Sequence, residues 1–228
     1  MLSLGIGMQV SVQESMAQWG SLNIIRIHQG MRYDYESGEP IGEERRLNDA
    51  ALEEIKSIDG VVAVSPIYQI YGQARLGRLE GHLQIVGLDT SVMEEMEFSV
   101  EHGRLPEPHE SFVAVAGAQV IQQFYDPRQM QQHRMGPMPR EEADPEKLLD
   151  QRVQVTFQNN FNYERSQNYN FFIVGILDES NMERAWEVFA PISDIKRIRD
   201  FINQGMERQA SSREVAVVGG AVIERAGA

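Results

Sequence analysis

Two histidines stand at either side of a proline-containing loop that is rich in carboxylates. His102 and His109 have Glu101, Glu107 and Glu110 beside them. Imidazole and carboxylate groups together are ligands for zinc and other transition metals. Surface loops of this composition are ordinarily solvated, and no two of the five histidines have the spacing of four residues that a helix would place on one face. We therefore predict no metal site.

Other catalytic patterns are also missing from the sequence. The serines Ser11, Ser65 and Ser111 lack the G-x-S-x-G context of a nucleophile elbow. Gly5 and Gly7 lack the preceding strand and the third glycine of a dinucleotide-binding loop. Without any cysteine, the chain has no disulfide, no zinc–thiolate site and no thiol nucleophile.

We interpret the acidic side chains as surface charges that keep the protein soluble. Neighbours on a helix point in different directions, so adjacent glutamates do not make a general acid and base. The adjacent pairs are Glu53 with Glu54, Glu94 with Glu95 and Glu141 with Glu142. We predict no catalytic residue, no cofactor-binding residue and no cofactor.

Length and charge limit the classes of function. The 228 residues have room for one or two domains. The formal charge of −13, from 34 acidic and 21 basic residues, disfavours general binding to nucleic acid or to an anionic membrane surface. No apolar run reaches the roughly 18 residues that a membrane-spanning helix needs. The absence of cysteine suits an extracytoplasmic domain, although many cytosolic proteins share it.

The first twenty residues predict a helix. Leu4, Met8, Val12 and Met16 recur every four residues, and Trp19 follows them. One interpretation is an amphipathic helix that packs on its own domain. The other is the exposed end of a transmembrane helix, because glycine and apolar residues fill the first turns and polarity rises after Met8.

The stretch from residue 47 to residue 106 organises the chain. Residues 47–58 have helical spacing, with Asn48 as N-cap and Gly60 as the end signal. Residues 61–67 and 82–88 then favour strands joined by a hairpin-like turn. Residues 91–98 favour helical turns, with Ser91 as cap and Glu94 completing a capping box.

The rest of the chain alternates between short strands, short helices and loops. Residues 30–46 and 126–147 favour loops, since glycine, proline and charge interrupt any periodicity. Loop tyrosines are candidates for partner contact, namely Tyr33, Tyr35, Tyr163 and Tyr169. Strands are expected at residues 23–27, 112–116, 153–157 paired with 169–177, 186–191 and 215–218, and helices at 117–125 and 192–205.

The order of these segments resembles the extracytoplasmic domain of MacB-type ABC transporter permeases, a family that includes the lipoprotein-releasing Lol permeases and, more remotely, FtsX. The resemblance covers roughly residues 4–205. It rests on seven short segments in the same order: LGIGMQVSVQESMAQWGSLNIIRI, DGVVAVSPIYQ, HLQIVGLDTS, GRLPE, FVAVAGAQVIQQF, NYNFFIVGILDES and VFAPISDIKRI.

The resemblance implies an α+β fold made of a Porter-like α/β subdomain and an inserted, β-rich Sabre-like subdomain. Residues 1–20 would be a stalk helix continuing from a transmembrane helix. Residues 21–104 would form the first part of the Porter-like subdomain, residues 105–182 the Sabre-like insertion, and residues 183–228 the Porter-like return and the tail.

The resemblance also implies a non-catalytic role at the outer face of the cell membrane. Such a domain carries cytoplasmic ATP hydrolysis outward as a conformational change, for export or extraction of a substrate. The implied partners are an ABC ATPase and a permease partner in a homo- or heterodimer, anchored through transmembrane helices. A membrane fusion protein or a cell-wall hydrolase could join them; nucleic acid would not. The alternatives are a stand-alone soluble binding module, an enzyme with an unrecognised acidic site, or an FtsX-like hydrolase regulator.

Overall fold

The structure is a computed structural model that describes residues 24–27, 32–33, 40–41, 48–128, 144–179, 182 and 184–204. The expected helix at residues 1–20 and the expected strand at 215–218 lie outside this part. The elements are β1 (Arg32–Tyr33), β2 (Pro40–Ile41), α2 (Asp49–Lys56), β3 (Tyr68–Leu76), β4 (Leu79–Leu88), η1 (Thr90–Val92), β5 (Val100–Gly103), β6 (Val113–Ala116), η2 (Val120–Gln123), β7 (Phe124–Tyr125), η3 (Pro145–Leu148), β8 (Arg152–Gln158), β9 (Ser166–Leu177), β10 (Glu187–Pro191) and α4 (Ile192–Ile202).

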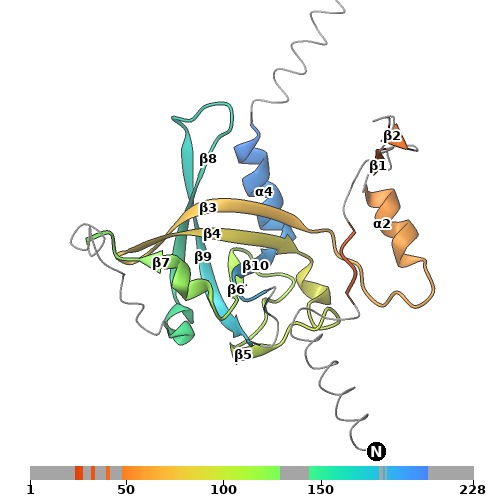
Figure 1. Ribbon diagram of the computed structural model, residues 1–228, viewed down its shortest axis with the longest axis horizontal. Coiled ribbons are helices and arrows are strands. Elements are labelled where there is room, and N and C mark those ends of the chain that lie inside the picture. Colours follow the sequence, from red (N-terminus) through yellow and green to blue (C-terminus); the bar gives the residue numbers. More distant parts are fainter. Residues whose placement is uncertain are drawn as a thin grey trace, which may run out of the picture.

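The larger sheet closes on itself as a barrel (Figure 1). Its strands follow the order β10, β6, β9, β8, β3 and β4, and β4 pairs again with β10. The β4–β10 and β6–β9 pairs are parallel, whereas the other pairs of the ring are antiparallel. β5 and β7 add short edges to β9 and β4. Closure leaves few strand edges open to a second chain.

Apolar side chains fill the barrel. Alternate residues of β3 and β8 are buried, as expected for strands with one inward face. Phe157 and Phe171 occupy the interior, each with 1% of its surface exposed. Gly72 makes room for Phe157, since a Cβ there would lie 2.7 Å from Cε1 of that ring. The result is a packed interior rather than a container.

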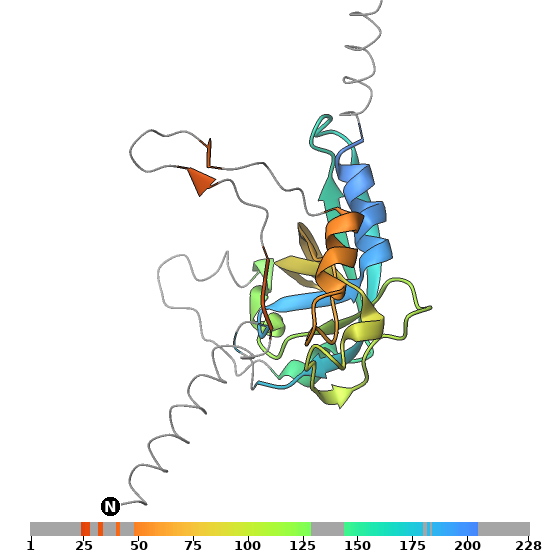
Figure 2. The same ribbon diagram turned by 90° about the vertical axis from the view of Figure 1, so that its right-hand side faces the viewer.

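Helix α4 lies against the barrel beside the β8–β9 hairpin (Figure 2). Its inward residues Ile195 and Ile198 are fully buried in the same core as the barrel interior. Gly87 on β4 permits this approach, because a Cβ there would lie 2.6 Å from Cβ of Ile195.

A second apolar cluster covers part of the outside of the barrel. Val86, Leu88 and Phe189 face outward from β4 and β10, and Met93 packs over them with no exposed surface. The chain segment of residues 89–105 therefore acts as a cover that is held by its own apolar contacts.

Several predicted elements are confirmed. Strands run through the predicted residues in β4, β6, β8, β9 and β10, and β8 pairs antiparallel with β9 as expected. α4 matches the predicted helix. In α2, Oδ1 of Asn48 accepts a hydrogen bond from the Ala51 N–H at 3.0 Å, and Gly60 follows with φ of +89°. The cap and the end signal were therefore identified correctly.

Other predicted elements are wrong. Residues 61–67 form no strand; the strand begins at Tyr68, where pairing with β4 starts, after Pro66 has removed a donor. Residues 24–27 are irregular and Ile25 is 82% exposed, so the strand predicted at residues 23–27 does not form there. Ser91 is not a cap, because the Asp89 carboxylate accepts from the Ser91 N–H instead. The helix expected at 117–125 is only the 3₁₀ turn η2, followed by β7.

The fold class is α+β, with a mixed sheet and two helices among the described residues. The division into Porter-like and Sabre-like subdomains stays a prediction. β10, from the expected return, lies between β4 of the first expected part and β6 of the expected insertion. Strands from all three parts thus share one sheet.

Candidate functional site

The two histidines considered as metal ligands have different carboxylate neighbours. Nε2 of His102 on β5 lies 3.4 Å from Oε1 of Glu146 and 4.0 Å from Oε1 of Glu101. Nε2 of His109 lies 3.4 Å from Oε2 of Glu107. Within the described ranges, no group of three histidine, aspartate or glutamate side chains could hold a metal ion.

An open hollow of about 580 Å³ lies beside β5. Its walls come from β5, from the turn that begins η3 and from the end of β9. The lining residues are Ser99, Val100, Glu101, His102, Asp144, Pro145, Glu146, Asp178 and Glu179. The carboxylates give this end of the barrel a negative potential.

Arg104 and Glu110 form a bidentate ion pair in the loop after β5. Nη1 of Arg104 donates to Oε2 of Glu110 at 2.7 Å, and Nη2 donates to Oε1 at 2.6 Å. Oε2 also accepts from the Glu107 N–H at 2.8 Å. The Arg104 hydrogen bonds lower the pKa of Glu110 from 4.5 to about 2, against the opposing effect of burial. The same pairing raises the pKa of Arg104.

This loop leaves β5 beside strand β9, where Gly103 pairs with Gly175. The Arg104 N–H donates to the Val174 carbonyl at 2.9 Å. A Cβ on Gly175 would collide with the Arg104 carbonyl, and Gly103 has φ of +83°, which favours glycine. Backbone contact and ion pair together fix the loop against the barrel.

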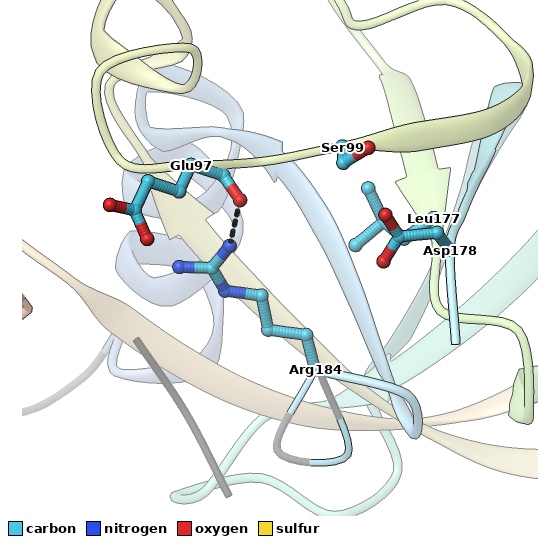
Figure 3. A pocket seen from close by; sticks show the side chains of 5 residues that line it. All are labelled: Glu97, Ser99, Leu177, Asp178 and Arg184. Carbon is cyan, nitrogen blue, oxygen red and sulfur yellow. Dashed lines mark hydrogen bonds between the residues drawn. The ribbon is translucent and has the colours of Figure 1, made fainter. Parts of the chain in front are cut away.

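Arg184 fastens the outer cover to the connection between β9 and β10. Its Nη1 donates to the Glu97 carbonyl at 2.9 Å and its Nη2 to the Met96 carbonyl at 2.8 Å. The guanidinium also lies 3.9 Å from the centre of the Phe98 ring. Figure 3 shows Arg184 reaching Glu97, with Asp178 across a space of about 10 Å³, which is enough for roughly one water molecule. Sequence reasoning missed this residue.

Ser111, one of the serines considered as a nucleophile, has a structural role. Its Oγ donates to Oδ1 of Asp194 at 2.6 Å, and the Phe112 N–H donates to Oδ2 at 2.6 Å. Asp194 is fully buried in the first turn of α4, where the helix dipole favours a negative charge. Ser65 is similarly occupied, since its Oγ accepts from the Asp89 N–H at 2.9 Å and donates to the Pro66 carbonyl. Ser11 lies outside the described residues.

Asn159 connects the β8–β9 loop with the end of α4. Its Nδ2 donates to the carbonyls of Phe201 at 2.7 Å and Gln204 at 3.0 Å. Its Oδ1 accepts from the N–H groups of Phe161 and Asn162, both at 2.9 Å. The side chain is 1% exposed and uses both donors and its acceptor. Its only sequence signal is its place directly after β8.

The candidate tyrosines for partner contact differ in exposure. Tyr163 in the β8–β9 loop is 75% exposed. Tyr169 stacks on Phe112 with ring centres 5.7 Å apart, and burial raises its pKa. Tyr33 lies in β1, and Tyr35 is outside the described residues. Of the two candidates whose exposure the structure describes, Tyr163 is therefore the one with a largely open ring; Tyr71 on β3, which was not among the candidates, is also 69% exposed.

Comparisons with known proteins identify a family. The model of the MacB-like periplasmic core domain matches residues 1–226. No curated protein matches the chain. Among the helices of the described part, none is long and apolar enough to span a membrane.

Solved structures that the chain is similar to include two transporter domains. One is the extracellular domain of the noncanonic ABC-type transporter YknZ from Gram-positive bacteria, with 14% identity and a TM-score of 0.42, covering 65% of this chain and 64% of that chain. Another is the periplasmic region of MacB from Actinobacillus actinomycetemcomitans, with 13% identity and a TM-score of 0.39, covering 66% and 57%. The match spans less than two thirds of each of those chains. By the family match over residues 1–226, this chain belongs to the family of MacB-like periplasmic core domains.

Proposed function

We propose that the chain is the extracytoplasmic domain of an ABC transporter permease, anchored at the cell membrane, and that it transmits ATP-driven conformational change without catalysing a reaction. The observation that carries this proposal is the family match over residues 1–226. The partners would be an ABC ATPase and a second permease copy or a related permease. Residues 1–20 would be the stalk, with 21–104, 105–182 and 183–228 as the two subdomains and the tail.

The packing of the barrel supports a mechanical role. A domain that transmits movement must resist deformation, and tightly packed interiors do so. Phe157 and Phe171 fill the barrel, Arg184 fastens its outer cover, and Asn159 fastens α4 to the hairpin. The strands of both proposed subdomains share the closed sheet, so we propose that the described barrel moves as one body.

Protease access to the full-length protein in spheroplasts tests the proposed placement. We expect externally added protease to cleave within this chain while a cytoplasmic marker stays intact. Protection of the chain until the membrane is permeabilised would place it inside the cell and refute the proposal.

Calorimetric titration of the chain with Mg–ATP and, separately, with Zn²⁺ tests the non-catalytic role. We expect no saturable heat from either ligand, because ATP would bind to a separate ATPase. Saturable nucleotide binding by this chain would instead favour an enzyme.

A further inference from the structure

The exposed side of α4 carries an unusual concentration of positive charge for this chain. Lys196, Arg197 and Arg199 lie within one turn, and we call them the basic face; Asp200 is the acidic residue beside them. The whole chain has a formal charge of −13. We propose that the basic face is an interaction surface for an acidic segment of a second protein.

The basic face makes no ion pair within the described part of the chain. Some other exposed cations do: Nζ of Lys56 lies 2.9 Å from Glu53, and Nη2 of Arg75 lies 2.8 Å from Glu80. By contrast, no described carboxylate, Asp200 included, comes within 4.0 Å of the head group of Lys196, Arg197 or Arg199. Their charge remains available to carboxylates from outside.

Aromatic rings hold these cations in place. The guanidinium carbon of Arg199 lies 4.1 Å from the centre of the Tyr68 ring, and Nζ of Lys196 lies 5.8 Å from the same centre. The guanidinium of Arg197 lies 5.6 Å from the centre of the Phe112 ring. Contact with a ring face leaves the N–H donors free, and it reduces the conformational entropy that binding would otherwise remove.

The chemistry favours an acidic polypeptide over a bilayer. The apolar side of α4 is already used, since Ile195 and Ile198 are fully buried, so the helix has no apolar face to insert. The charge of −13 opposes approach to an extended anionic surface. A single acidic segment is less affected, because salt screens charges that lie more than about 8 Å away at physiological ionic strength. Arginine forks also match carboxylates in geometry.

Binding of a fluorescein-labelled deca-glutamate peptide, followed by anisotropy at low salt, tests the proposal. The test variant is K196Q/R197Q/R199Q. The matched control is K56Q/R75Q/R78Q, which removes the same amount of charge from exposed positions elsewhere. Circular dichroism verifies that both variants are folded. A variant with Arg197→Gln alone retains the two cations beside Tyr68 and serves if the triple variant does not fold.

We expect saturable binding that the basic-face variant weakens by about tenfold, that the control changes by less than about twofold, and that Arg197→Gln weakens by an intermediate factor. No binding by the unmodified chain would overturn the proposal, as would equal weakening in the control. Two further outcomes would also overturn it. One is basic-face-dependent binding to phosphatidylglycerol vesicles without peptide binding. The other is self-association in sedimentation velocity that the basic-face variant abolishes, since the occupant would then be a second copy. This proposal and the proposed function as an extracytoplasmic permease domain can fail separately. Peptide binding by the isolated chain does not depend on which side of the membrane the chain lies.

Discussion

The guanidinium of Arg184 lies 3.9 Å over the Phe98 ring while its nitrogens donate to the carbonyls of Met96 and Glu97. One side chain thus joins the connection between β9 and β10 to the cover over the second apolar cluster. Glu97 has φ of +57°, a conformation that is costly for a residue with a side chain. The arginine therefore stabilises a turn that the local sequence does not favour.

Replacing Arg184 with methionine should lower the free energy of unfolding by about 2–4 kcal/mol, because the variant keeps much of the packing but loses two charge-assisted hydrogen bonds and the ring contact. Urea denaturation measures this loss, and hydrogen exchange should show faster exchange around Phe98. Arg78→Met, in the exposed β3–β4 turn, is the control and should change stability by less than about 0.5 kcal/mol. Equal effects of the two substitutions would contradict the role of Arg184.

Asn159→Ala should destabilise the chain by about 2–3 kcal/mol, since it leaves two partly buried carbonyls at the end of α4 without their donor and removes the acceptor of two loop N–H groups. Asn159→Asp should cost more, because a buried carboxylate would face the carbonyls of Phe201 and Gln204. Thermal and urea unfolding provide the measurement. The neighbouring Asn160→Ala, which removes an exposed 3.2 Å bond to Asn203, should have a small effect. A stable Asn159→Asp variant would show that the asparagine donors are unimportant.

Glu110 should make the free energy of unfolding depend on pH in the acidic range. Its pKa is about 2 in the folded chain and near 4.5 when unfolded, so its contribution is fully present above pH 4.5 and is lost as the pH falls toward 2. Allowing for the exposure of Arg104, we expect Glu110→Gln to cost about 1–2 kcal/mol at pH 7. Urea denaturation at pH 7, 5 and 3.5 should show little change at pH 5 and a difference from the unmodified chain that has shrunk by about two fifths at pH 3.5. A difference that does not vary with pH would rule out this ion pair as its source. Glu53→Gln, in an exposed helix pair, should cost less than about 0.5 kcal/mol.

Gly87→Ala should displace α4, because its Cβ would lie 2.6 Å from Cβ of Ile195. We expect a loss of about 2–3 kcal/mol together with faster hydrogen exchange throughout α4. Gly77→Ala is the comparison: its φ of +59° costs about 1 kcal/mol, but no atom lies within 4 Å of the added carbon. Unchanged exchange in α4 of Gly87→Ala would show that the helix does not depend on this close approach.

The sequence predicted elements whose signals are local. Alternation in β8 and the isoleucine spacing of α4 are readable within a few residues, because each pattern shows one buried face. The start of β3 was misplaced because Gly72 and Ala74 are its inward residues. At Gly72 a side chain would collide with Val155 and Phe157 of β8, and Ala74 pairs with Val155 of the same strand. The inward position of these two small residues is explained only by packing against β8, which lies far along the chain.

The contacts that fasten the barrel were not predictable for the same reason. Arg184 and Glu97 lie 87 positions apart, and Asn159 and Phe201 lie 42 positions apart. Neither residue has a motif around it that indicates its partner. The carboxylates and His102 beside β5 were noticed in part, but η3 brings Glu146 to them only in the folded chain.

The central claim is that the described barrel moves as one rigid body, relative to the same barrel in a second copy, when ATP is bound in the cytoplasm. The chain has no cysteine, so exposed sites on the barrel can be spin-labelled uniquely within it. In the membrane-reconstituted complex, spin labels are attached to the Gln73→Cys variant on two copies. Pulsed electron paramagnetic resonance should then report a distance between the two labels that changes when ATP is trapped. The distance between labels at Gln73→Cys and Ser193→Cys within one copy should stay constant. An unchanged distance between copies in the two nucleotide states would contradict the account.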